Sequence, residues 1–238
     1  MKLLISPLDR DEALEAIKGG ADIIDVKNPA EGSLGANFPW IISEIKGLLP
    51  NGTELSATIG DFPNLPGTAS LAALGAASLG VNYVKIGLYG VNSSEEAVKL
   101  ATPAVRAVKE SHPDTGVVIA GYADYERVGS IASTLIPSVA KDAGADIAML
   151  DTAVKDGKNL FDFIGMKELG EFVKNSHDLG IRVALGGSLT MEHIQPLSEM
   201  GVDIIGIRGA ACQNSDRIGG RIRAELVKEL RDCIKHSD

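Results

Sequence analysis

The sequence predicts a single (β/α)8 TIM barrel that spans residues 1–238 as one domain. Its length of 238 residues suits one barrel of this kind. A pattern of glycine, two small or polar residues and an apolar run occurs four times. Its glycines, Gly20, Gly80, Gly144 and Gly201, stand 60, 64 and 57 residues apart. Each period is twice the roughly 30 residues of a βα unit, so four periods make eight units.

The strands follow from this repeat. One strand opens the chain at residues 2–6, and each repeated glycine leads into another. The intermediate strands are expected at residues 54–60, 116–122 and 181–186. Each repeated glycine follows an apolar helical pattern, such as residues 11–18, as a glycine at a helix C-terminus should. An open doubly wound sheet is the alternative, and the lack of a Gly-x-Gly-x-x-Gly motif after the first strand weakens it.

Composition excludes several classes of partner. The chain has 23 Lys and Arg against 32 Asp and Glu and only 4% aromatic residues, which argues against nucleic-acid binding. No apolar run approaches the length of a membrane span, and the opening residues lack the features of a signal peptide. Two cysteines give neither a disulfide framework nor zinc spacing. We therefore expect a cytoplasmic protein with no membrane partner.

Strand parity separates apolar from charged residues. Counted from each repeated glycine, the even positions are all apolar and should pack on the outer helices. The odd positions should point into the barrel at the C-terminal strand ends, where enzymes of this fold place their chemistry. They are Asp25, Lys27, Lys85, Gly87, Met149, Asp151, Gly206 and Arg208.

These inward charges need a physical reason. Alternate strands lie about 10 Å apart, so long side chains from them can share one cavity. Burying a charge without a partner costs about several kcal/mol. A catalytic site is the interpretation that we favour, and an ion network that plugs the barrel is the alternative.

Two inward lysines suit imine chemistry. A lysine amine condenses with a carbonyl substrate, provided that its pKa falls below the ordinary value of about 10.4. Lys27 and Lys85 can lower each other's pKa, whereas Asp25 and Asp151 oppose this effect and can move protons. Parity leaves open which influence wins. None of the four histidines stands at a predicted strand end, so we expect no metal and no cofactor.

Glycine-rich segments follow the last two strands. Barrels of this type often bind phosphate on backbone N–H groups after strands seven and eight. Gly187, Ser188, Arg208 and Gly209 occupy these positions and are the candidate substrate-binding residues. A Gly-Gly-Ser run is equally typical of a plain turn, and its place in the eight-unit count is what favours a phosphate site.

Two loops also stand out. Residues 27–40 after the second strand are rich in Gly, Asn and Pro and could form a lid or one wall of the site. The loop after the sixth strand adds Lys155, a candidate site residue, and Lys158, for which solvated loop charge is the stronger interpretation. Cys212 follows the last strand and is expected to be a small buried filler.

Seven motifs resemble the (5-formylfuran-3-yl)methyl phosphate synthase family, and the resemblance extends over essentially the whole chain. They are DIIDVKNP at 22–29, GSLGANFPW at 32–40, KIGLYG at 85–90, GYAD at 121–124, MLDTA at 149–153, KDGK at 155–158 and RGAAC at 208–212. The one difference is Gly186, where the family has a small residue rather than a fixed glycine.

The resemblance implies a lyase of methanofuran biosynthesis. Such an enzyme joins two molecules of glyceraldehyde 3-phosphate into a phosphorylated hydroxymethyl-furan aldehyde, with loss of phosphate and water. By this resemblance Lys27 is the Schiff-base lysine and Lys85 the proton acceptor, while Asp25, Asp151 and Lys155 match other active-site positions. A class I aldolase, a sugar-phosphate isomerase and a phosphate-binding barrel without turnover remain alternatives. We also expect a homo-oligomer, since acidic barrels with exposed apolar helix faces commonly assemble.

Overall fold

Eight parallel strands form a closed barrel in the computed structural model, which describes residues 1–61, 64–217 and 219–237. The strands are β1 (Lys2–Ile5), β2 (Ile23–Val26), β3 (Glu54–Asp61), β4 (Tyr83–Gly87), β5 (Gly116–Tyr122), β6 (Ile147–Asp151), β7 (Arg182–Leu185) and β8 (Ile204–Ile207). Each strand pairs with its neighbours in sequence, and β8 pairs with β1 to close the ring. The predicted barrel is confirmed, with strand ends shifted by one residue at Ser6, Asp61, Ile181 and Gly186.

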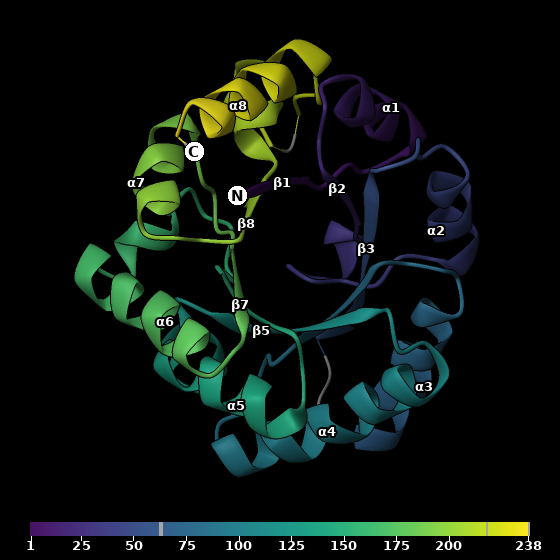
Figure 1. The fold of residues 1–238 in the computed structure, drawn as a ribbon, viewed down its shortest axis with the longest axis vertical. Coiled ribbons are helices and arrows are strands. Elements are labelled where there is room, and N and C mark those ends of the chain that lie inside the picture. The colour runs from purple at the N-terminus through teal and green to yellow at the C-terminus, as the bar shows by residue number, and fades with distance from the viewer. Residues whose placement is uncertain (62–63, 218, 238) are drawn as a thin grey trace.

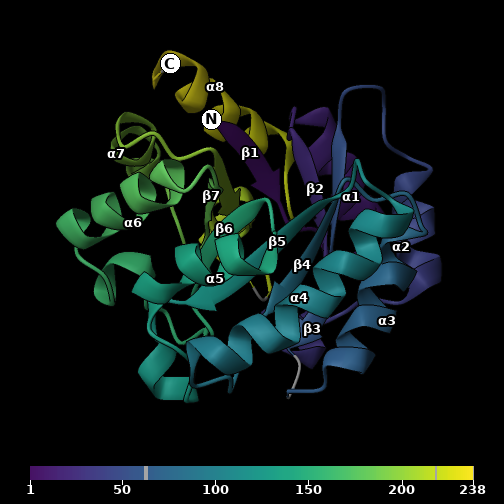
Figure 2. The same cartoon turned by 60° about the horizontal axis from the view of Figure 1, so that its bottom comes forward.

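The helices surround the ring of strands (Figures 1 and 2). They are α1 (Arg10–Lys18), α2 (Pro39–Lys46), α3 (Pro66–Ala77), α4 (Ser94–Ser111), α5 (Ile136–Ala143), α6 (Met166–Asp178), α7 (Ile194–Glu199) and α8 (Ala224–Ser237). Side chains cap two of them, because Asp9 accepts the N–H of Glu12 and Ser93 accepts the N–H of Glu96. No helix of the described ranges is both long enough and apolar enough to cross a membrane.

The repeated glycines stand where helices turn back toward strands. Gly20, Gly80, Gly144 and Gly201 have φ angles of 85°, 74°, 76° and 86°. A residue with a Cβ is strained in this left-handed region, and glycine is not. The fourfold repeat thus records four helix ends of the same geometry, as the sequence predicts.

Strand parity divides the apolar residues into two cores, as predicted. The even positions after the repeated glycines, from Ile24 to Ile207, belong to the large cluster between strands and helices. A smaller cluster, which includes Ile23, Val118 and Met149, fills the barrel interior. At the N-terminal end of the strands, Lys2 Nζ lies 2.7 Å from Glu54 Oε2, which also accepts the hydroxyl of Tyr83. The charged residues of the opposite end form the site.

Candidate active site

A cavity of about 460 Å³ lies at the C-terminal end of the barrel. Its lining comes from β1, β2, β6 and β8 and from residues that follow β1, β2, β6, β7 and β8. Five charged residues predicted from parity or from the loop after β6 line it: Asp25, Lys27, Asp151, Lys155 and Arg208. The volume suits a small organic ligand.

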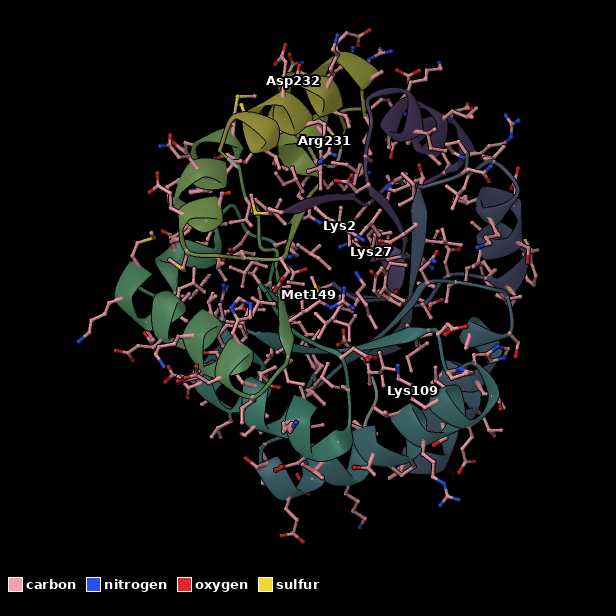
Figure 3. The ribbon with its side chains drawn as sticks, in the orientation of Figure 1. Lys2, Lys27, Lys109, Met149, Arg231 and Asp232 are labelled. Carbon is pink, nitrogen blue, oxygen red and sulfur yellow. The ribbon has the colours of Figure 1, made fainter. Side chains whose placement is uncertain are left out.

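Lys27 presents an amine without a partner to this cavity. Its side chain follows β2 and is 8% exposed, and Figure 3 shows it inside the ring of strands together with Met149. No acceptor of the described residues forms a hydrogen bond or ion pair with Lys27 Nζ. Burial lowers its pKa to about 8, although the charges of Asp151 and Asp25 act to raise the pKa and those of Lys85 and Lys155 to lower it further. About a tenth of the amine is then neutral at pH 7, against about one part in three thousand at the ordinary pKa.

Lys85 and Asp25 form a fully buried pair, of which Asp25 lines the cavity and Lys85 does not. Lys85 Nζ lies 2.6 Å from Asp25 Oδ1, at ion-pair distance but without the angles of a hydrogen bond. Asp25 Oδ2 accepts the hydroxyl of Ser6 at 3.0 Å. Burial alone would raise the pKa of Asp25, but the charges of Lys85 and Lys27 outweigh it and lower the pKa. Within the described chain, Lys85 therefore keeps hydrogen-bond donors in reserve.

Asp151 and Lys155 form a second pair, whose charges also act on Lys27. Lys155 Nζ lies 2.6 Å from Asp151 Oδ1 and 3.0 Å from Thr152 Oγ1. Burial opposes ionisation of Asp151, but the charges of Lys155 and Lys27 and the N–H of Thr152 lower its pKa to about 2. A Cβ on Gly186 would lie 3.3 Å from Asp151 Cγ and Oδ2, so a larger residue there would press on this carboxylate. The other four candidate catalytic residues thus all act by their charges on the amine of Lys27.

The segments after β7 and β8 offer unused backbone N–H groups. Gly187, with φ 102°, and Ser188, with φ 52°, make a sharp turn at the cavity wall. In the described part of the chain, the N–H groups of residues 187–189 have no acceptor. The same holds for Gly209 and Ala210, at the start of the short 3-10 helix Gly209–Ala211. Such N–H groups favour an anion.

Arg208 also lines the cavity, but most of its donors point away from it. The two N–H groups of Nη1 donate to Ser6 O at 2.8 Å and to Glu12 Oε2 at 2.7 Å. Nη2 donates to Glu12 Oε1 at 3.3 Å, and Nε donates to the carbonyl of Arg217 at 3.1 Å. One of its five N–H groups is left to bind a phosphate. The phosphate contact of Arg208 therefore stays a prediction, for which only this one donor is available.

The loop of residues 27–40 closes part of the barrel mouth. Leu34 is buried in the inner cluster, Ser33 Oγ donates to Thr152 O at 3.0 Å, and Thr58 Oγ1 donates to Gly35 O at 2.6 Å. Beyond Lys27 itself, the loop contributes no residue to the cavity lining. These hydrogen bonds hold the loop across the barrel mouth, and the loop does not form a wall of the cavity.

Two other loop residues lie outside the site. Lys158 Nζ stands 5.6 Å from the centre of the Phe163 ring and does not line the cavity. Cys212 is buried in the outer core, as expected of a filler.

Five residues near the site escape sequence reasoning. Ser6 ends the first predicted strand with inward parity, and that signal would have found it. In the sequence, Glu12 resembles any acidic residue in the first turn of a helix, and Arg217 resembles any residue of a turn. No signal in the sequence would have found either of them. Asp61 and Tyr122 form a hydrogen bond above Gly87, whose missing side chain leaves room for it, and burial raises the pKa of both. No group of three or more His, Cys, Asp or Glu residues able to hold a metal occurs within the described ranges.

Comparisons with known proteins agree on one family. The family model described as 4-HFC-P synthase matches residues 3–231. The (5-formylfuran-3-yl)methyl phosphate synthase of Methanocaldococcus jannaschii is 57% identical over 235 residues, which cover 99% of this chain and 100% of that protein. The protein of the same name from Methanopyrus kandleri is 54% identical over 233 residues, or 98% of each chain.

Solved structures share the fold at low identity. A 3-hexulose-6-phosphate synthase superposes with a TM-score of 0.67 and 19% identity over 98% of this chain and 100% of that one. KGPDC from Streptococcus mutans gives a TM-score of 0.66 and 16% identity over 99% and 97% of the two chains. At this identity the likeness speaks for the barrel alone.

Proposed function

This chain belongs to the 4-HFC-P synthase family, and from that premise we propose that it makes (5-formylfuran-3-yl)methyl phosphate in methanofuran biosynthesis. The substrates are two molecules of glyceraldehyde 3-phosphate, and one phosphate and two molecules of water leave. The observation that carries the proposal is the amine of Lys27, which is buried, unpaired, open to the cavity and lowered in pKa to about 8.

The reaction begins on Lys27. Its neutral amine attacks the aldehyde carbon of one triose phosphate, and water leaves as the imine forms. The protonated imine acidifies the hydrogen on the neighbouring carbon. We assign removal of this proton to Lys85, the proton acceptor that the resemblance implies. Its ammonium first passes a proton to Asp25 Oδ1, 2.6 Å away, and the neutral amine then accepts the proton from carbon. The electron pair left on carbon can then expel the phosphate from the next carbon.

Asp151 and Lys155 take different parts in this scheme. With a pKa of about 2, Asp151 stays ionised at neutral pH and cannot be the proton donor. It balances the positive charge of the protonated imine on Lys27. Lys155, held by Asp151 and Thr152, carries the proton that a departing oxygen needs.

The backbone N–H groups after β7 and β8 bind a phosphate of the substrate in this proposal. Residues 187–189, 209 and 210 supply donors without acceptors on the wall of the same cavity. The expected cytoplasmic location and homo-oligomer stay predictions.

The test is incubation of the purified protein with glyceraldehyde 3-phosphate, followed by mass analysis and a phosphate assay. A furan aldehyde phosphate and one released phosphate per product are expected. Dihydroxyacetone phosphate as the only product would favour an isomerase, and a hexose bisphosphate would favour an aldolase. Binding of the triose phosphate with no product at all would favour a barrel without turnover.

A further inference from the structure

Two arginines line the cavity, and only one of them has its donors engaged. Arg208 gives four of its five N–H groups to protein acceptors, whereas the side chain of Arg217 has no hydrogen bond or ion pair within the described residues. We propose that Arg217 is the guanidinium that binds a substrate phosphate at the turns after β7 and β8. This inference rests on the proposed function and names the side chain that recognises its substrate.

Arg217 lies beside the unused backbone donors. A Cβ on Gly209 would lie 3.8 Å from Arg217 Cβ, which places Arg217 next to the start of the 3-10 helix Gly209–Ala211. Both residues line the cavity, as do Gly187 and Ser188 on its β7 side. A phosphate on these N–H groups would therefore stand next to the base of the Arg217 side chain.

Within the described residues, the guanidinium of Arg217 forms no ion pair. Its side chain is half-buried, and burial lowers its pKa, while the charge of Asp151 acts to raise the pKa and that of Arg208 to lower it. Asp151 is already paired with Lys155 at 2.6 Å. A half-buried cation without a counter-ion is costly, and a phosphate dianion would remove that cost. The flat guanidinium can donate two parallel N–H groups to two phosphate oxygens.

Arg208 then has a positioning role. Its Nε donates to the carbonyl of Arg217, and its Nη1 donates to Ser6 and to the buried Glu12. These contacts tie the segment that carries Arg217 to β1 and α1. Arg208 thus holds the backbone of this segment in place, and Arg217 binds the phosphate.

The decisive experiment compares Arg217→Gln with Arg223→Gln. Arg223 is six residues further along, exposed, and not part of the cavity lining, so it is a matched control. Arg217→Gln should weaken binding of inorganic phosphate, measured by calorimetry, and raise KM for glyceraldehyde 3-phosphate, each by about tenfold to a hundredfold. Arg223→Gln should leave both values unchanged, and Arg217→Lys should recover part of the loss.

A second readout separates phosphate binding from the imine. Borohydride trapping with unphosphorylated glyceraldehyde should proceed in Arg217→Gln as in the unsubstituted protein, because Lys27 is untouched. Wild-type phosphate affinity and KM in Arg217→Gln would overturn the assignment, and so would loss of trapping with glyceraldehyde, which would mean a general collapse of the site. If the unsubstituted protein made no furan product, the proposed function would fail, while the calorimetric comparison would still decide the role of Arg217.

Discussion

Two buried groups of charges stand at the same end of the barrel and differ in their hydrogen bonding. One is Glu12 with Arg208, and the other is Lys27 with Lys85. Glu12, 1% exposed, accepts from Arg208, from the N–H of Leu8 at 2.8 Å and from the N–H of Ile222 at 3.4 Å. Among the described residues, Lys27 has no such partner and Lys85 has one ion pair. Both groups are buried, so burial does not distinguish them, whereas unused hydrogen-bonding capacity does.

The residue types fit this difference. Arginine stays protonated under all ordinary conditions and offers a rigid fork, which suits a permanent tie between β1, α1 and the segment after β8. A buried lysine loses its proton far more easily, which suits a nucleophile. We therefore expect the pair of Glu12 and Arg208 to matter for stability, and Lys27 and Lys85 to matter for turnover.

The largest effect is expected on turnover, from Lys85→Met in the group of Lys27 and Lys85. Loss of the proton acceptor should lower turnover by about 10²–10⁴-fold. It also removes a like charge that lowers the pKa of Lys27, so imine formation should shift to higher pH and persist there. Turnover and borohydride trapping across pH measure both effects, with exposed Lys99→Met as the control. Turnover within a few-fold of wild type would place Lys85 outside the reaction.

Arg208→Ala tests the group of Glu12 and Arg208, in which most hydrogen bonds are made. It leaves the carboxylate of Glu12 buried without its cation, which should cost about 3–5 kcal/mol of unfolding free energy. Urea unfolding measures this loss. The double variant Glu12→Ala and Arg208→Ala should lose less than the sum of the two single variants, since no uncompensated charge remains. Strict additivity would contradict the structural role of the pair.

Asp151→Asn should move the pH profile in the direction opposite to Lys85→Met. The Asp151 carboxylate is the largest nearby charge that raises the pKa of Lys27, so its removal should lower that pKa below about 8. Trapping of the imine should then begin at lower pH than in the unsubstituted protein. A shift to higher pH would mean that Asp151 does not act on Lys27 through its charge.

The smallest effect is expected from a chelator. In the imine scheme a protonated nitrogen withdraws electrons from the substrate, and no step calls for a Lewis-acidic metal. Activity should therefore be the same with and without excess EDTA. Loss of activity that added zinc or magnesium restores would reject the scheme in its present form.

The sequence predicts the barrel and most of the site because both depend on local periodicity. The repeated glycine fixes the strand starts, and strand parity then places Asp25, Lys27, Lys85 and Asp151 inside. What it cannot give are partners that meet only after the barrel closes. Glu12 and Arg208 are 196 residues apart, and nothing near either residue marks the other. For the same reason, parity favours Arg208 as the phosphate ligand, while the structure leaves Arg217 with the unused donors.

The most direct test of the central claim is to map the covalent adduct. The protein is treated with glyceraldehyde 3-phosphate and borohydride, digested, and sequenced by mass spectrometry. The account predicts irreversible inactivation with the reduced adduct on Lys27, the one cavity lysine of the described chain whose amine has no partner. Lys27→Arg, which keeps the charge but has no usable amine, should show neither adduct nor turnover. An adduct on Lys85 or Lys155 would contradict the claim that the unpaired amine is the nucleophile.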